Sequence, residues 1–165
     1  NHNDAAQEKT MRAHALKNVE KALTAEEKSF ASAAKNSLTE LGLAKDWGYY
    51  AQAGEDQVRA RAAKRGDIVA AEDGRNFLEL ALSYYDRAQQ PDKAQKVRDK
   101  ARALAKQHES KGEGLVAADY YAIAGDSTKA SAVQKETEAR EQKVEESRKK
   151  TFKKDQDDLE KALGF

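Results

Sequence analysis

The chain carries GYYAQAGEDQ at residues 48–57, SYYDRAQQPD at 83–92 and DYYAIAGDST at 119–128. Each stretch holds two adjacent tyrosines, and the first members of the pairs are 84 − 49 = 35 and 120 − 84 = 36 residues apart. An alanine follows each pair at the same offset (Ala53, Ala88 and Ala124), and a polar turn follows the alanine. Near-constant spacing of this length is typical of helical repeats, in which each helix–turn–helix unit buries its apolar face against its neighbours. The sequence therefore predicts an all-α array.

Composition supports a helical protein and excludes several classes of partner. The 165 residues carry a formal net charge of only +1 although 36% of them are charged, so no overall field recruits nucleic acid or an acidic membrane. Much of the apolar content is alanine, the best helix former, and Pro91 is the only proline. No apolar run approaches the roughly 18 residues that a transmembrane helix needs. We expect no nucleic-acid partner and no transmembrane segment.

The compartment stays open at this stage. The chain starts at Asn1 rather than at a methionine. Removal of a signal peptide, removal of a lipoprotein linker and a simple chain boundary all fit that start. The absence of cysteine excludes disulfides and thiolate chemistry but does not select a compartment.

Capping residues and glycines give the expected helix boundaries. The first helix is predicted to start after Asn3 or Asp4, and the capping-box pattern of Thr24 with Glu27 predicts a second start. That second helix is expected to bury Phe30, Ala33, Ala34, Leu38 and Leu41, with Gly42 either ending it or bending it. Pro91 suits the first position of a later helix. Turns are predicted at residues 54–56, near Gly66, and at 73–74, 89–92, 112–114 and 125–126.

The turn regions resemble the tetratricopeptide repeat. The last unit, Ala118-x-x-Tyr121-x-x-x-Gly125-Asp126-x-x-Lys129-Ala130, has the small residue, aromatic, Gly-Asp turn and second small residue of that family. The middle unit matches through Tyr85, Gln89, Asp92-Lys93 and Ala94, and the first through Tyr50 and Gly54-Glu55. Four positions depart from the family pattern: Trp47, Arg59, Arg98 and Gln134. The proline that usually closes a unit is also absent.

The resemblance implies a right-handed superhelical array of antiparallel helix pairs. Units are expected at about residues 38–73, 74–111 and 112–139, within a repeat domain that covers residues 1–139. Residues 140–165 are expected to form a charged helical extension, with a basic cluster at 148–154 and an acidic one at 155–160. Its only apolar stripe is a weak one made by Phe152, Leu159 and Leu163. Whether this helix packs back or projects is left open.

Helix geometry divides the two tyrosines of each pair. Adjacent helical residues point about 100° apart, so both members cannot be equally deep. The second members lie in register with the following alanine and are expected in the core: Tyr50, Tyr85 and Tyr121. The first members are expected beside them, with their hydroxyl groups toward water: Tyr49, Tyr84 and Tyr120.

The expected function is a non-enzymatic scaffold that binds a segment or helix of a protein partner in the groove of the array. Register from the second tyrosines, carried over from the family, selects the groove-facing positions Gly48, Gln52, Glu79, Ser83, Asp86, Arg87, Asp119 and Ile123. The alternative is a structural bundle or coiled-coil module that self-associates through its N-terminal or C-terminal helix. Monomer and weak homo-oligomer both remain open.

Residues that would support catalysis or metal binding do not form recognisable sets. The histidines at positions 2, 14 and 108 lack the i, i+3 or i, i+4 spacing of helical metal ligands. The glycines at 112 and 114 lack the preceding strand and the following Lys-Ser/Thr of a phosphate-binding loop. We therefore expect no catalytic residues, no metal and no cofactor.

Overall fold

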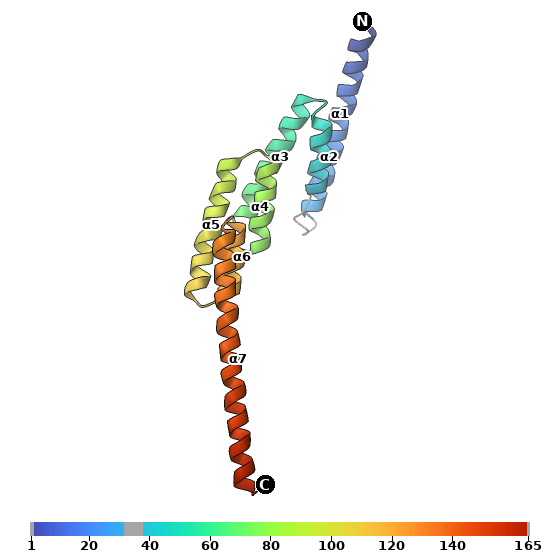
Figure 1. The fold of residues 1–165 in the computed structure, drawn as a ribbon. Helices are drawn as coiled ribbons and strands as arrows, with labels where there is room; N and C mark the ends of the chain where they lie inside the picture. Colours follow the sequence, from blue (N-terminus) through green and yellow to red (C-terminus); the bar gives the residue numbers. More distant parts are fainter. Residues whose placement is uncertain (1, 32–37, 165) are drawn as a thin grey trace. The chain divides into compact units, whose positions relative to one another are not determined.

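The computed structural model describes residues 2–31 and 38–164, and most of these residues are in α-helices (Figure 1). No strand occurs in the described part of the chain, so the all-α prediction is confirmed. The helices are α1 (His2–Ser29), α2 (Leu38–Gly48), α3 (Gln52–Ala70), α4 (Arg75–Arg87), α5 (Pro91–Ser110), α6 (Gly114–Ile123) and α7 (Ser127–Leu163).

The chain forms two compact units, Asn1–Lys100 and Ala101–Phe165. In the N-terminal unit α1 packs on α2 and α3, α2 also packs on α3, and α3 packs on α4. In the C-terminal unit α6 packs along the first part of α7. Helix α5 begins in the first unit and ends in the second. Within each unit, the helices with these contacts therefore pack mainly on their neighbours in sequence.

Small residues allow the helices to approach closely, and two glycines expected at turns have this role instead. A Cβ atom at Gly54 would lie 2.9 Å from Val19 Cγ2, and one at Gly66 would lie 2.7 Å from Tyr85 Cε1. Both glycines lie inside α3, so the turn expected at residues 54–56 and the helix end expected near Gly66 are wrong. Because glycine is also the usual turn residue, its type alone did not distinguish the two roles.

The N-terminal helix is longer than the sequence suggested. Thr24 does not cap a second helix, because α1 continues to Ser29 and the Thr24 hydroxyl donates to the Glu20 carbonyl oxygen at 2.8 Å. Gly42 lies inside α2 and does not end it. Leu41 is fully buried on α2, whereas Ala33 and Ala34 lie outside the described residues.

Other boundaries are confirmed. Pro91 is the first residue of α5. Gly112 and Gly125 have φ angles of +78° and +81°, in the left-handed region that favours glycine at helix ends. Gln89 has φ +55° and occupies the place after Tyr85 that Gly125 occupies after Tyr121. The last two tyrosine-bearing helices thus end in the same way.

The tyrosine pairs are not equivalent, and the expected division within each pair is wrong in part. Tyr85 and Tyr121 are buried as predicted, but Tyr84 and Tyr120 are buried as well. Tyr50, predicted as a core residue, is 57% exposed. The reason is that α2 ends at Gly48, so the first pair lies in the turn before α3, whereas the other pairs lie inside α4 and α6.

A pair of glycine substitutions tests the close approach of α3 and α4. Gly66→Ala forces a methyl group into the Tyr85 ring, and overpacking of this kind costs about 1–3 kcal/mol of unfolding free energy. Gly42→Ala is the matched control inside α2, because its nearest neighbour, Arg87 Nη2, would lie at an ordinary 3.6 Å. We expect the control to stabilise by up to about 1 kcal/mol through helix propensity. Urea unfolding measures both, and equal effects would contradict the packing of α3 on α4.

Candidate functional site

The residues expected to line a groove fall on three helices. Glu79, Ser83 and Asp86 follow one face of α4, where the Ser83 hydroxyl donates to the Glu79 carbonyl oxygen at 3.1 Å. Arg87 is the fourth expected position on α4. Its guanidinium lies against α2, because a Cβ atom at Gly42 would be 3.6 Å from Arg87 Nη2. Arg87 is half-buried, whereas Glu79 and Asp86 are exposed.

The remaining groove positions do not join that face. Gln52 is the exposed first residue of α3, and Gly48 is buried at the end of α2. Asp119 and Ile123 lie on α6 in the C-terminal unit, where Asp119 is exposed and Ile123 is only 8% exposed. Ile123 is thus part of the core of its unit.

The buried second tyrosines anchor a repeated polar triad. The Tyr85 hydroxyl donates to Asp67 Oδ1 at 2.8 Å, and Lys93 Nζ donates to both oxygens of Asp67 at 2.8 Å. In the C-terminal unit the Tyr121 hydroxyl donates to Glu109 Oε2 at 2.7 Å, and Lys129 Nζ donates to Glu109 Oε1 at 2.9 Å. Both lysines follow their tyrosine by eight residues and approach its ring, at 5.7 and 5.6 Å from the centroid.

The contacts within the triads shift the pKa values of their members. The hydrogen bond from Lys93 lowers the pKa of Asp67 against the opposing effect of burial, and the hydrogen bond from Tyr121 lowers that of Glu109. Burial raises the pKa of Tyr85, and it raises that of Tyr121 to about 12. A tyrosine held protonated in this way is a poor base or nucleophile. The triads join each tyrosine-bearing helix to the helices before and after it.

The first tyrosine pair has no such triad, because Val58 occupies the place of the lysine. Instead, the turn after α2 directs Tyr50 onto Trp47. The Tyr50 amide donates to the Trp47 carbonyl oxygen at 3.1 Å and the Ala51 amide to the Gly48 carbonyl oxygen at 3.0 Å. Gly48 fits this turn because a Cβ atom there would lie 2.7 Å from the backbone of Glu55.

These contacts assemble an exposed cluster that we call the aromatic surface, defined by His14, Trp47 and Tyr50. The His14 and Trp47 rings meet edge to face with centroids 5.6 Å apart, and the Trp47 and Tyr50 centroids are 6.1 Å apart. His14 is also within 3.3 Å of the Asn18 side-chain amide. Trp47 is 37% exposed, more than a tryptophan packed in a core.

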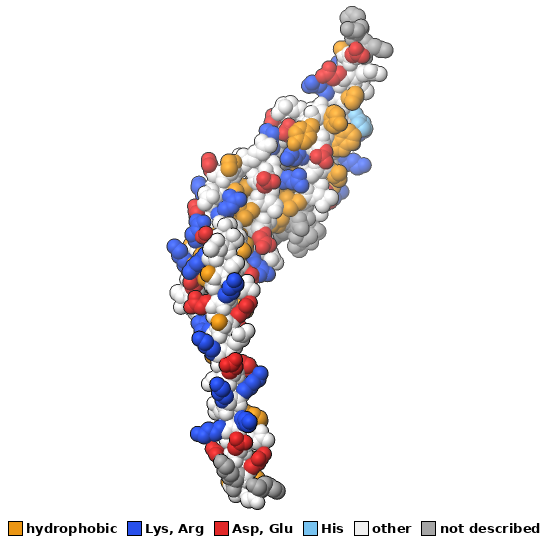
Figure 2. Space-filling model, viewed as in Figure 1, with side chains coloured by type: hydrophobic (Ala, Val, Ile, Leu, Met, Phe, Trp, Pro, Cys, Tyr) orange, Lys and Arg blue, Asp and Glu red, His pale blue; other side chains and the backbone are white. Residues whose placement is uncertain are grey.

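Apolar side chains extend the aromatic surface along both helices. Met11 lies one turn before His14 on α1, and Leu43 lies one turn before Trp47 on α2; both are more than half exposed. Figure 2 shows hydrophobic side chains grouped beside a histidine over α1 and α2. Contiguous exposed apolar area of this kind marks interaction sites more often than isolated exposed residues do. The aromatic surface was not predicted from the sequence. The one signal for it was Trp47, a tryptophan at a position where the tetratricopeptide resemblance expects a small residue.

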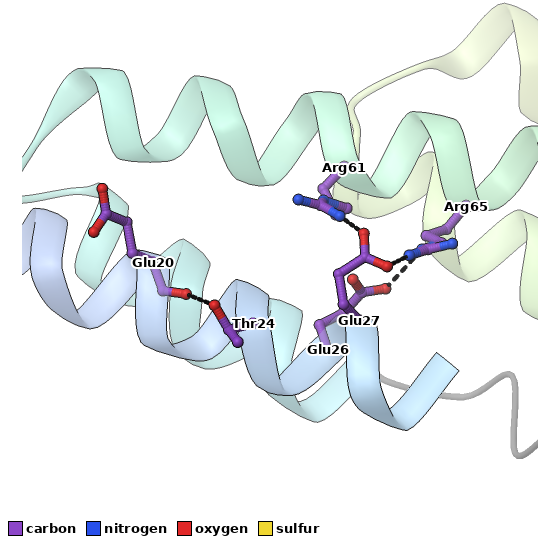
Figure 3. A network of polar contacts seen from close by, with 6 residues as sticks. All are labelled: Glu20, Thr24, Glu26, Glu27, Arg61 and Arg65. Carbon is purple, nitrogen blue, oxygen red and sulfur yellow. Dashed lines mark hydrogen bonds and ion pairs between the residues drawn. The ribbon is translucent and has the colours of Figure 1, made fainter. Parts of the chain in front are cut away.

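A second polar cluster joins α1 to α3 (Figure 3). Glu26 is fully buried and accepts a bond from Arg65 Nε at 3.2 Å, while Glu27 pairs with both Arg61 and Arg65. The Arg65 guanidinium lies 3.9 Å from the centroid of the Phe30 ring. If either partner were displaced, the other would be left as an unpaired buried charge, which is costly. The cluster therefore links α1 and α3 in this register.

A depression of about 270 Å³ lies beside the first triad, lined in part by Tyr85, Lys93, Lys96 and Lys100. Lys93 is bonded to Asp67, and Lys100 Nζ donates to the carbonyl oxygens at 70, 71 and 72 and pairs with Asp73. These two cations therefore hold the C-terminal end of α3, where a positive charge is favourable.

Within residues 2–31 and 38–164, no three side chains among His, Cys, Asp and Glu lie closely enough together to hold a metal ion. None of the helices described there combines the length and the apolar character needed to cross a bilayer.

Comparison of the chain with protein-family models, with curated proteins and with solved structures gave no match. The tetratricopeptide resemblance therefore rests on the quoted residues of the turn regions.

The triads predict a specific pH dependence of stability. A lowered folded-state pKa of Asp67 and Glu109 stabilises the protein above their ordinary values of 3.8 and 4.5, and this contribution is lost as the pH falls below them. The raised pKa of Tyr121 acts in the opposite direction, so its contribution is present below pH 10 and lost as the pH rises toward about 12. We expect the free energy of unfolding, measured with urea across pH, to fall less steeply at acid pH in the double variant Asp67→Asn/Glu109→Gln than in the wild type. Parallel acid limbs would contradict the triads.

Proposed function

We propose that the protein is a non-enzymatic scaffold that binds an apolar-anchored segment of a protein partner on the aromatic surface. The observation that carries this proposal is the exposed contact of His14, Trp47 and Tyr50 across α1, α2 and the turn that follows. Tryptophan and tyrosine dominate the energetics of protein interfaces because they supply large rigid area together with one polar group.

The partner segment that fits is an amphipathic helix or an extended segment with bulky apolar anchors. Met11 and Leu43 extend the surface by one helical turn on each helix, so an apolar stripe on the partner could lie along them. The Arg12–Glu8 ion pair on α1, at 2.8 Å, lies close in sequence to Met11 and provides a polar rim of mixed sign. Mixed sign at the rim favours modest dependence on salt.

The helix pairs are proposed to belong to a right-handed tetratricopeptide-like array. Support comes from the shared pattern of the last two units: a buried tyrosine pair, a left-handed residue four positions after the second tyrosine, and the lysine of the triad eight positions after it. In such an array the face of α4 that carries Glu79, Ser83 and Asp86 is a second candidate for the partner surface.

Selection of a phage-displayed peptide library on the full chain tests the proposal and separates the two surfaces. Trp47 is the only tryptophan, so its fluorescence reports directly on occupancy. Bound peptides should share apolar anchors and shift the emission to shorter wavelength. Trp47→Ala removes this signal, so its affinity is measured by the fluorescence anisotropy of a dye-labelled peptide. The substitution should weaken binding by about thirtyfold, since truncating an interface hot spot typically costs about 2 kcal/mol.

Asp86→Arg is the matched control on the exposed face of α4, and it should leave peptide affinity unchanged. Circular dichroism checks that both variants retain their helix content. If Asp86→Arg abolishes binding while Trp47→Ala does not, the partner binds the α4 face and the aromatic surface is not the site.

A further inference from the structure

The distal part of α7 presents an apolar stripe that its own unit does not cover. After Thr137, every described side chain of α7 is exposed, including Phe152 at 73%, Leu159 at 59% and Leu163 at 63%. Figures 1 and 2 show this part of α7 extending well beyond α6, with basic and acidic side chains along it. The intrahelical pair of Lys149 with Glu145, at 3.5 Å, helps an isolated helix of this kind to persist.

The stripe has the spacing of a short coiled-coil seam. Taking Phe152 and Leu159 as d positions places Gln156 and Leu163 at a, so four successive seam positions contain three apolar residues and one glutamine. Val144 falls at a c position, outside this seam. A seam of three to four turns with one polar layer predicts weak rather than obligate association.

The charges that flank the seam distinguish one pairing geometry from another. Lys153 and Glu160 occupy the e positions, and Arg148 and Asp155 occupy the g positions. In a parallel pair, g faces the following e, which would place Arg148 against Lys153 and Asp155 against Glu160. In an antiparallel pair, e faces e, which places Lys153 of one helix against Glu160 of the other. Only the antiparallel arrangement brings opposite charges together.

We propose that α7 pairs with α7 of a second copy of this chain, antiparallel, over residues 152–163. In this register Phe152 of each copy packs on Leu163 of the other, and Gln156 packs on Leu159. The two Lys153–Glu160 pairs flank the seam symmetrically, as a two-fold interface requires. The same segment supplies both halves of the interface, so a second copy matches it in both apolar pattern and charge.

Sedimentation velocity of the full chain, from low to high micromolar concentration, tests this pairing. A concentration-dependent monomer–dimer equilibrium is expected for the wild type. Leu159→Ser should shift it to monomer. Val144→Ser, the matched change at a 47% exposed aliphatic residue outside the seam, should leave it unchanged. A wild type that remains monomeric throughout, or equal effects of the two changes, overturns the proposal.

Charge reversal tests the orientation independently. Lys153→Glu alone, and Glu160→Lys alone, each place like charges at both e–e contacts and should weaken the dimer about tenfold. Mixing the two variants restores opposite charges at both contacts, so the mixture should dimerise as well as the wild type. In a parallel pair each single reversal would strengthen the dimer instead. Strengthening, or a mixture no better than its components, therefore contradicts the antiparallel seam.

Discussion

The triad of tyrosine hydroxyl, carboxylate and lysine is the interaction on which the regular part of this protein depends. The core is built largely from alanine, so few large aliphatic side chains hold the helix pairs together. A buried tyrosine supplies the missing apolar area, and its hydroxyl needs a partner when it is removed from water. Asp67 and Glu109 provide that partner, and Lys93 and Lys129 hold the carboxylates in place. One interaction therefore connects the end of a helix, the next helix and the helix after it.

Departure from the triad is what frees the first tyrosine pair for another role. Val58 cannot replace a lysine, and the early end of α2 at Gly48 places Tyr50 in a turn rather than in a helix. Its ring then meets Trp47 at the surface instead of entering the core. The tyrosine pair is therefore buried in α4 and α6 but exposed after α2. The proposal of a partner surface rests on this exposed first pair.

Local pattern predicted those parts of the fold that depend on local chemistry. Helical class, the start at Pro91, the turns at Gly112 and Gly125, and the helical extension followed from propensity and capping. Gly54, Gly66 and Thr24 were misread because their roles depend on contacts with Val19, with Tyr85 and within a continuing helix. The aromatic surface joins residues from α1 and α2, and contacts between residues far apart in the chain produce no periodic pattern in the sequence. A lone tryptophan in a small-residue position was its single clue.

Solvent access of the six tyrosines is the measurement that tests this account most directly. Fluorine NMR of the chain labelled with 3-fluorotyrosine, assigned by single Tyr→Phe variants, reports each ring separately when a soluble paramagnetic agent is added. The account predicts strong broadening for Tyr49 and Tyr50 and little for Tyr84, Tyr85, Tyr120 and Tyr121. If Tyr50 is protected as well as Tyr85 is, the first pair is a core element and the aromatic surface does not exist.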